Sequence, residues 1–302
     1  MSVRTSPSTG KAYGVLRTCA AWGIPRSSFY AKTCPSSRRS EDEPTLEKGK
    51  TGPKTEISDG ELLSLIRDDL ASSSFTGEGH RKVWARLRFV RGIPVSRKRV
   101  LRIMREANLL SPHRVPQKPP YEHTGRIVTS DPNLMWGTDS ARVFTTGDGW
   151  GWIFACVEHW NSECMGHHVT KRGDRFAALE PVAQGLMSEF GSVETGAARG
   201  LSLRTDHGSQ HLSNHFQKQI KAWGIAPSFA FLEQPQTNGV VERFFRTLKE
   251  QVIYGRVYES LEDVREAVSR FVELYNSRWL IEKNGYLSPA DARRAYYESE
   301  AA

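Results

Sequence analysis

Three carboxylates of this chain stand where a side chain can be held rigidly. Asp139 lies in the apolar run 134–139, Asp206 ends the run 201–206 just before a glycine turn, and Glu242 follows an Asn-Gly pair that opens a helical pattern. Carboxylate oxygens are the ligands that Mg²⁺ prefers in proteins. Three of them converging from separate elements could hold divalent cations against a phosphodiester.

The local context of these carboxylates says more than their spacing. With 34 Asp and Glu in 302 residues, about four acidic pairs at any fixed separation arise by chance. Asp206 and Glu242 are separated by 35 residues, and the order is strand, strand end with a glycine turn, and helix start. The alternative for each carboxylate is a surface acid or a helix cap. It applies most to Glu242, because acids favour the first turn of any helix.

Two phrases carry a resemblance to a known family. Thr-Asp-His-Gly-Ser-Gln at 205–210 and Gln-Thr-Asn-Gly-Val-Val-Glu-Arg-Phe-Phe-Arg-Thr-Leu-Lys at 236–249 resemble the D,D-35-E core of transposases and retroviral integrases. They are most similar to IS3-type insertion-sequence transposases, the product of the second reading frame. The resemblance spans about residues 12–295. It departs from the family pattern at Ser140-Ala141 and at Trp279, where a histidine is usual.

The chemistry expected of this site is cleavage of DNA 3′ ends and their joining to target DNA. Two ions of Mg²⁺ or Mn²⁺ would be held by Asp139, Asp206 and Glu242, with Asp139 bridging both. A DNA 3′-hydroxyl could replace water as the nucleophile, so no covalent enzyme intermediate is needed. Lys249 lies two helical turns after Glu242, and the resemblance implies that it contacts DNA phosphate; a solvated lysine is the alternative. The other DNA-contact candidates on this helix are Arg243 and Arg246.

Hydrophobic patterning predicts the elements that position these residues. Strands are expected over 134–145, 150–158, 164–170, 201–206 and 225–231, and helices over 174–190, 211–223, 239–254 and 260–276. This order predicts an α/β chain with an RNase H-like catalytic core, a mixed five-stranded sheet with flanking helices. A small all-helical helix-turn-helix region precedes it.

Composition shifts divide the chain into five parts. We expect a helix-turn-helix-like segment and flexible linker over 1–55, a helical DNA-binding domain over 56–112, a linker over 113–128, the integrase core over 129–256 and a helical tail over 257–302. An ordinary helical hairpin fits residues 11–32 equally well.

Positive charge is concentrated in the N-terminal part. Residues 1–128 hold 24 Lys and Arg against 12 Asp and Glu, a balance of +12, whereas the remainder has a balance of −4. A helix capped by Ser96 is expected to carry an apolar stripe backed by five cations. These cations, candidates for DNA contact, are Arg97, Lys98, Arg99, Arg102 and Arg105. A solvated basic face is the alternative.

No apolar run approaches the roughly 20 residues needed to span a bilayer, and the N-terminus has no signal-peptide pattern. A cytoplasmic protein is therefore expected, and the resemblance implies that it is bacterial and nucleoid-associated. The cysteines form no C-x-x-C pair and are expected to be reduced thiols; they are Cys19, Cys34, Cys156 and Cys164. A zinc site at Cys164, His167 and His168 is not expected, because these residues lie on a strand with alternating faces.

The expected partners are DNA, both terminal inverted repeats and target, and further copies of the chain on that DNA. The resemblance also implies an upstream-frame product as fusion or partner. A catalytically inactive, sequence-specific DNA-binding or regulatory protein of the same fold is the alternative function. A nuclease without strand transfer is a third possibility.

Overall fold

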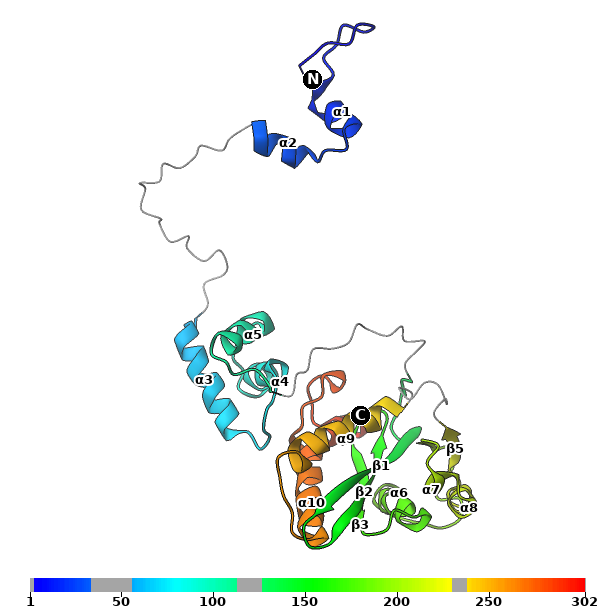
Figure 1. Ribbon diagram of the computed structural model, residues 1–302. Coiled ribbons are helices and arrows are strands. Elements are labelled where there is room, and N and C mark those ends of the chain that lie inside the picture. Colours follow the sequence, from blue (N-terminus) through cyan, green and yellow to red (C-terminus); the bar gives the residue numbers. More distant parts are fainter. Residues whose placement is uncertain (1–2, 34–55, 113–126, 230–237, 302) are drawn as a thin grey trace. The chain divides into compact units, whose positions relative to one another are not determined.

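The computed structural model describes residues 3–33, 56–112, 127–229 and 238–301, and the chain forms two compact units, Met1–Glu56 and Ile57–Ala302 (Figure 1). The first unit holds α1 (Gly14–Ala21) and α2 (Arg26–Thr33), which are the two short helices expected there. Cys34 and nearly all of the two predicted linkers lie outside the described residues.

A three-helix bundle opens the second unit. It comprises α3 (Asp59–Ser72), α4 (His80–Ala85) with its π-helical continuation η1 (Arg86–Val90), and α5 (Arg97–Glu106). The hydroxyl of Ser96 accepts a hydrogen bond from the backbone N–H of Arg99, so the predicted cap is confirmed. The buried core of the bundle is formed by Leu62, Ile66, Val83, Leu87, Val95, Val100, Ile103 and Met104.

The predicted mixed five-stranded sheet is confirmed. Its strands are β1 (Met135–Thr145), β2 (Gly149–Glu158), β3 (Cys164–Thr170), β4 (Ser202–Thr205) and β5 (Ala226–Phe229). They lie in the order β3-β2-β1-β4-β5. The β1–β2 and β2–β3 pairs are antiparallel, whereas β1–β4 and β4–β5 are parallel. Three antiparallel strands, β1 to β3, are followed by two strands that pair in parallel, β4 and β5. This is an RNase H-like arrangement.

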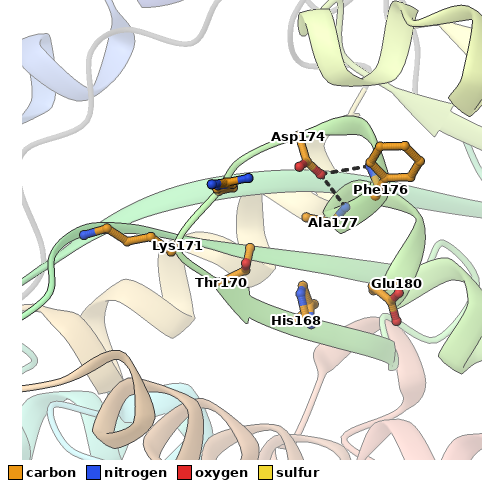
Figure 2. A pocket seen from close by; sticks show the side chains of 8 residues that line it. His168, Thr170, Lys171, Asp174, Phe176, Ala177 and Glu180 are labelled. Atoms are coloured by element: carbon orange, nitrogen blue, oxygen red, sulfur yellow. Dashed lines mark hydrogen bonds between the residues drawn. The ribbon is translucent and has the colours of Figure 1, made fainter.

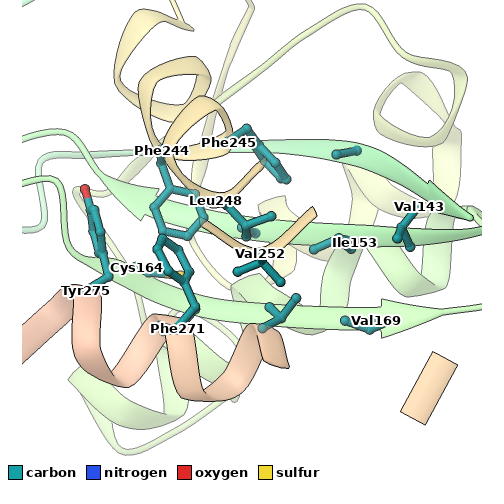
Figure 3. Packing of buried hydrophobic residues seen from close by; sticks show 14 of the residues in the cluster. Val143, Ile153, Cys164, Val169, Phe244, Phe245, Leu248, Val252, Phe271 and Tyr275 are labelled. Carbon is teal, nitrogen blue, oxygen red and sulfur yellow. The ribbon is translucent and has the colours of Figure 1, made fainter. Parts of the chain in front are cut away.

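Helices cover both faces of the sheet, because its strands alternate apolar side chains between the two faces. On one face α6 (Arg175–Phe190) and α8 (Asn214–Ala222) pack on Trp136 and Phe154. On the other face α9 (Gly239–Leu248) and α10 (Leu261–Arg278) pack on Val143 and Ile153 (Figure 3). The α9 helix therefore carries its residues onto the odd-numbered face of β1.

Three predicted elements differ in detail. The helix expected over 211–223 is two helices, α7 (Ser209–Leu212) and α8, because Ser213 is extended and its hydroxyl caps α8. The helix expected over 239–254 is α9 followed by the π-helix η3 (Lys249–Ile253). The last strand ends at Phe229, and its predicted residues 230–231 lie outside the described part.

The C-terminal segment continues after α10 with η4 (Glu282–Asn284) and α11 (Pro289–Glu300). Trp279, the departure from the family pattern, packs edge-on against Phe75 at a centroid distance of 4.8 Å. The Lys82 ammonium lies 2.8 Å from the centroid of the same ring. Among the described helices, none has the length and apolar character to cross a membrane.

Candidate metal and DNA-binding site

Asp139 lies in β1, and Asp206 directly follows β4, the neighbouring parallel strand. The β1–β4 register pairs Gly137 with Arg204, and each aspartate stands two residues further along the chain. Side chains two residues apart point to the same face of a sheet, so both carboxylates project toward the face that α9 covers. The strand context expected for Asp139 and the strand-end context expected for Asp206 are both confirmed.

A glycine in β1 lets α9 approach this face. A Cβ at Gly137 would lie 2.5 Å from Val241 Cγ2 and 2.9 Å from Asn238 Oδ1. Asn238 is buried, and its Nδ2 donates to the Thr138 carbonyl at 3.5 Å. The Asn-Gly pair therefore anchors the start of α9 over β1, and Glu242 lies in the first turn of that helix.

The three carboxylates influence one another electrostatically. Burial raises the pKa of Asp139, and the charge of Asp206 raises it further. The N–H of Ser140 and the charges of His211 and Lys249 act in the opposite direction. The pKa of Glu242 is also raised, first by partial removal from water and then by the charge of Asp139. Negative charge thus gathers here, which favours a cation.

Asp206 behaves differently, because hydrogen bonds hold it ionised. The hydrogen bond with His211 lowers the pKa of Asp206, and the N–H of Gly208 acts in the same direction. The turn after β4 therefore stabilises the charged form of this carboxylate. A Cβ at Gly208 would lie 2.9 Å from Asp206 Oδ1, so a larger residue here would have to displace this carboxylate.

The donor type and charge of the site suit a hard divalent cation such as Mg²⁺. Asp139 and Asp206 offer carboxylate oxygens from two adjacent strands, and Glu242 acts on Asp139 from α9. Within the described residues, however, no three Asp, Glu, His or Cys side chains lie close enough together to share one ion. Glu242 is exposed in the first turn of α9.

The cations predicted on the α9–η3 segment divide into two kinds. Lys249 is half-buried and its charge reaches Asp139, so it lies on the carboxylate side of the segment. Arg243 is exposed, and Arg246 is paired with Glu250 at 3.0 Å while remaining 61% exposed. The spacing argument for Lys249 thus agrees with its position beside the site.

Not all of the five predicted cations of α5 are available to DNA. Arg99 lies 2.7 Å from Asp59 and donates to the Ile57 carbonyl, and Arg102 also pairs with Asp59. These contacts tie α5 to the start of α3. Arg97 lies 3.4 Å from Glu282. In the part of the chain that the structure describes, the exposed cations of this helix without an ion pair are Lys98 and Arg105.

A shallow cavity of about 350 Å³ lies elsewhere, at the junction of β3 and α6 (Figure 2). His168 and Thr170 line it together with Lys171, Asp174 and Glu180. His168 pairs in register with Phe154, a residue of the α6-side core, so the cavity faces away from the carboxylates. His167 points the other way, with Nε2 3.0 Å from the Ser269 hydroxyl, as the alternation of this strand predicts.

Two site residues were missed by sequence reasoning. Gly137 permits the contact between α9 and β1, and His211 lies under Asp206. A glycine within a strand, here two residues before Asp139, is a weak signal of close helix packing. A histidine five residues after Asp206 gives no signal of its own, because only the fold of the turn brings the two together.

Two domain families match the chain. An HTH-like domain matches residues 63–117, and an integrase core domain matches residues 223–289. The integrase core match includes Glu242 and runs past residue 257, where sequence patterning placed the start of the tail. Asp139 and Asp206 lie N-terminal to the matched residues.

Curated proteins similar to the chain are insertion-sequence transposases. Transposase InsD of insertion element IS2 from Escherichia coli is 27% identical over 223 residues, covering 72% of this chain and 73% of InsD. The transposase predicted for element IS986/IS6110 of Mycobacterium tuberculosis is 26% identical over 258 residues, covering 81% of this chain and 91% of that protein. The resemblance to insertion-sequence transposases, on which the expectations for this chain rested, is thereby confirmed.

Solved integrase structures are also similar to this chain. A simian T-cell lymphotropic virus intasome has a TM-score of 0.45 at 17% identity, covering 78% of this chain and 74% of that one. The catalytic core of BIV integrase has a TM-score of 0.41 at 18% identity, with coverage of 56% and 99%. The HTLV-2 integrase core in complex with magnesium has a TM-score of 0.41 at 17% identity, with coverage of 54% and 97%.

Proposed function

We propose that this chain is a DNA transposase that cleaves 3′ ends at the terminal repeats of an insertion sequence and joins them to target DNA. The observation that carries the proposal is that Asp139 lies in β1, Asp206 follows the end of the adjacent parallel strand β4, and Glu242 lies on the helix that covers the same face. This is an arrangement of hard oxygen donors from three separate elements, in a chain that carries an HTH-like domain.

The three carboxylates have different tasks in this proposal. Asp139 is held in the middle of β1 and offers a fixed donor, while Asp206 is kept ionised by its hydrogen bonds. Glu242 completes the donor set from the first turn of α9. Mg²⁺ or Mn²⁺, with two ions expected, would supply charge neutralisation at the phosphodiester and activation of the attacking hydroxyl.

The cations near the site would hold the DNA. Lys249 lies on the carboxylate side of the α9–η3 segment and would contact the phosphate next to the scissile bond. Arg243 and Arg246, both exposed, would contact phosphates further away. Lys98 and Arg105 of the HTH-like domain would add sequence-independent phosphate contacts, which fix the position of a protein on DNA.

The test is a joining reaction with the full chain, DNA carrying the element's own terminal repeats, and Mg²⁺ or Mn²⁺, with the upstream-frame product supplied. Glu242→Gln removes one charge without changing shape. It is expected to reduce joined product about a hundredfold or more, the order of loss when one preorganised group that stabilises transition-state charge is removed. Glu266→Gln, on the exposed side of α10, is the matched control and should join DNA normally.

Joined products that persist in Glu242→Gln would contradict the catalytic role. If the wild-type chain binds the repeats but yields neither cleaved nor joined DNA, the inactive DNA-binding interpretation holds instead. Cleaved ends without joining would indicate a nuclease.

A further inference from the structure

His211 contacts the Asp206 carboxylate, and its side chain is completely buried. Its Nδ1 is 2.6 Å from Asp206 Oδ1, and the N–H of Gly208 donates to the same oxygen at 3.0 Å. Asp206 Oδ2 has no hydrogen bond to any described residue, and the side chain is 46% exposed. One carboxylate oxygen is therefore anchored to the protein, and the other is open to solvent.

The ring of His211 is itself held in place. The carbonyl of His211 accepts a hydrogen bond from Gln217 Nε2 at 2.8 Å, and the ring packs edge-on against Phe216 at a centroid distance of 5.2 Å. Because an ionised carboxylate can only accept, Nδ1 must carry the proton in this contact. The imidazole thus acts as a fixed donor.

Burying the imidazole of His211 has an energetic cost that an apolar side chain would not have. The other ring nitrogen, Nε2, is buried and has no hydrogen-bond partner among the described residues. Leaving a buried polar atom without a partner is unfavourable, and an apolar side chain of similar size would avoid this cost. Within the described part, the one hydrogen bond of this imidazole is to Asp206.

We propose that His211 is a positioning residue that orients Asp206 so that Oδ2 is presented to a divalent cation. This inference rests on the proposed function, because it takes Asp206 as a metal ligand. Hydrogen bonds to the ligating groups of a metal site set their orientation, and losing one typically costs 10–100-fold in metal affinity. Asp139 needs no such support, since β1 fixes its backbone and the N–H of Ser140 donates to its Oδ1.

Mn²⁺ alone, titrated into the full-length chain without DNA, tests the proposal by calorimetry or electron paramagnetic resonance. His211→Leu removes the donor and should weaken Mn²⁺ binding 10–100-fold. His211→Asn places an amide N–H where Nδ1 was and should keep most of the affinity. His211→Gln carries the same amide one carbon further out and should behave like the leucine variant. His215→Asn, an exposed histidine on α8, is the matched control.

A second measurement separates positioning from mere folding. The Mn²⁺ concentration for half-maximal DNA joining should rise in His211→Leu and His211→Gln, whereas the rate at saturating Mn²⁺ should recover. A structural role would instead lower the rate at every Mn²⁺ concentration in proportion to lost folded protein. If His211→Leu unfolds, the comparison between Asn and Gln still decides.

Equal Mn²⁺ affinity in the wild type, His211→Gln and His211→Leu would overturn the inference and leave the proposed function standing. If Asp206→Asn binds Mn²⁺ as tightly as the wild type, or the wild type binds none, the metal site itself is wrong and the inference falls with it.

Discussion

At the scale of single residues, the site combines carboxylates whose environments differ. Asp139 and Glu242 are partly removed from water and repel each other, whereas two hydrogen bonds keep Asp206 ionised. Such like charges are unfavourable in the absence of a cation, because each raises the energy of the other's ionised form. The ionised carboxylates therefore lower the stability of the folded protein when no cation is bound. Binding of a divalent ion should raise that stability again.

The stability cost of Asp139 should depend on pH. Its pKa is raised above the ordinary 3.8 in the folded protein, so ionisation destabilises the fold. This cost is absent below the ordinary pKa and complete above the raised one. Without divalent metal, Asp139→Asn is expected to be more stable than the wild type at pH 7, with the difference shrinking as the pH falls toward 3.8.

Thermal unfolding of both proteins at several pH values measures this difference. Adding Mg²⁺ at pH 7 should raise the midpoint of the wild type and leave Asp139→Asn nearly unchanged. A variant that is less stable than the wild type at neutral pH would contradict the raised pKa.

At the scale of elements, the site depends on how closely α9 packs on β1. Gly137 provides the space, and Val241 and Asn238 fill it. The long α9–α10 interface with the sheet, which includes Phe244 and Phe271, holds the helix in place (Figure 3). The position of Glu242 therefore depends on the packing of Val241, the residue before it, and of Asn238, one turn earlier.

Gly137→Ala should force α9 outward, because the new methyl group would lie 2.5 Å from Val241 Cγ2. The expected loss of stability is about 1–3 kcal/mol, the usual cost of overpacking, and DNA joining should fall as Glu242 is displaced. Gly239→Ala adds the same methyl group at a position with nothing within 4 Å and is the control. Chemical denaturation and the joining reaction would be measured for both, and equal behaviour would show that the contact is unimportant.

At the scale of the whole molecule, positive charge is concentrated in the N-terminal part and negative charge in the part that carries the carboxylates. The first 128 residues carry a balance of +12 and the remainder −4. The net negative charge of the remainder repels phosphate, so the basic part must supply most of the attraction to DNA. The Arg99 and Arg102 contacts with Asp59 show that some of this charge instead stabilises the helical bundle.

Replacing both Lys98 and Arg105 with Ala should weaken DNA binding without unfolding the bundle, since both are exposed and unpaired within the described residues. If each contacts one phosphate, the slope of log affinity against log salt should fall by about 2. Fluorescence anisotropy at several salt concentrations measures it. Arg99→Ala serves as the contrast: it should lower the unfolding midpoint, because it breaks the Asp59 contact. An unchanged salt slope in the double variant would remove these two residues of α5 from the DNA interface.

Much of this protein follows from its sequence. The alternating strands, the glycine turn after Asp206 and the helix pattern around Glu242 are local signals, and the structure confirms the elements they predict. The break between α7 and α8 at Ser213 was not predicted. A serine inside an apolar helical pattern gives no local signal that it will cap a second helix. The catalytic assignment of the carboxylates stays a prediction.

The sequence by itself determined which residues could bind metal and DNA and in which elements they lie, because residue type, periodicity and turn chemistry are local properties. Only the tertiary structure decided which of them meet. The β1–β4 pairing brings the Asp139 and Asp206 ends of these strands together, and α9 packs on Gly137. His211 contacts Asp206, and Arg99 pairs with Asp59. These contacts join residues brought together by strand pairing, helix packing and a folded turn, and no local pattern specifies them.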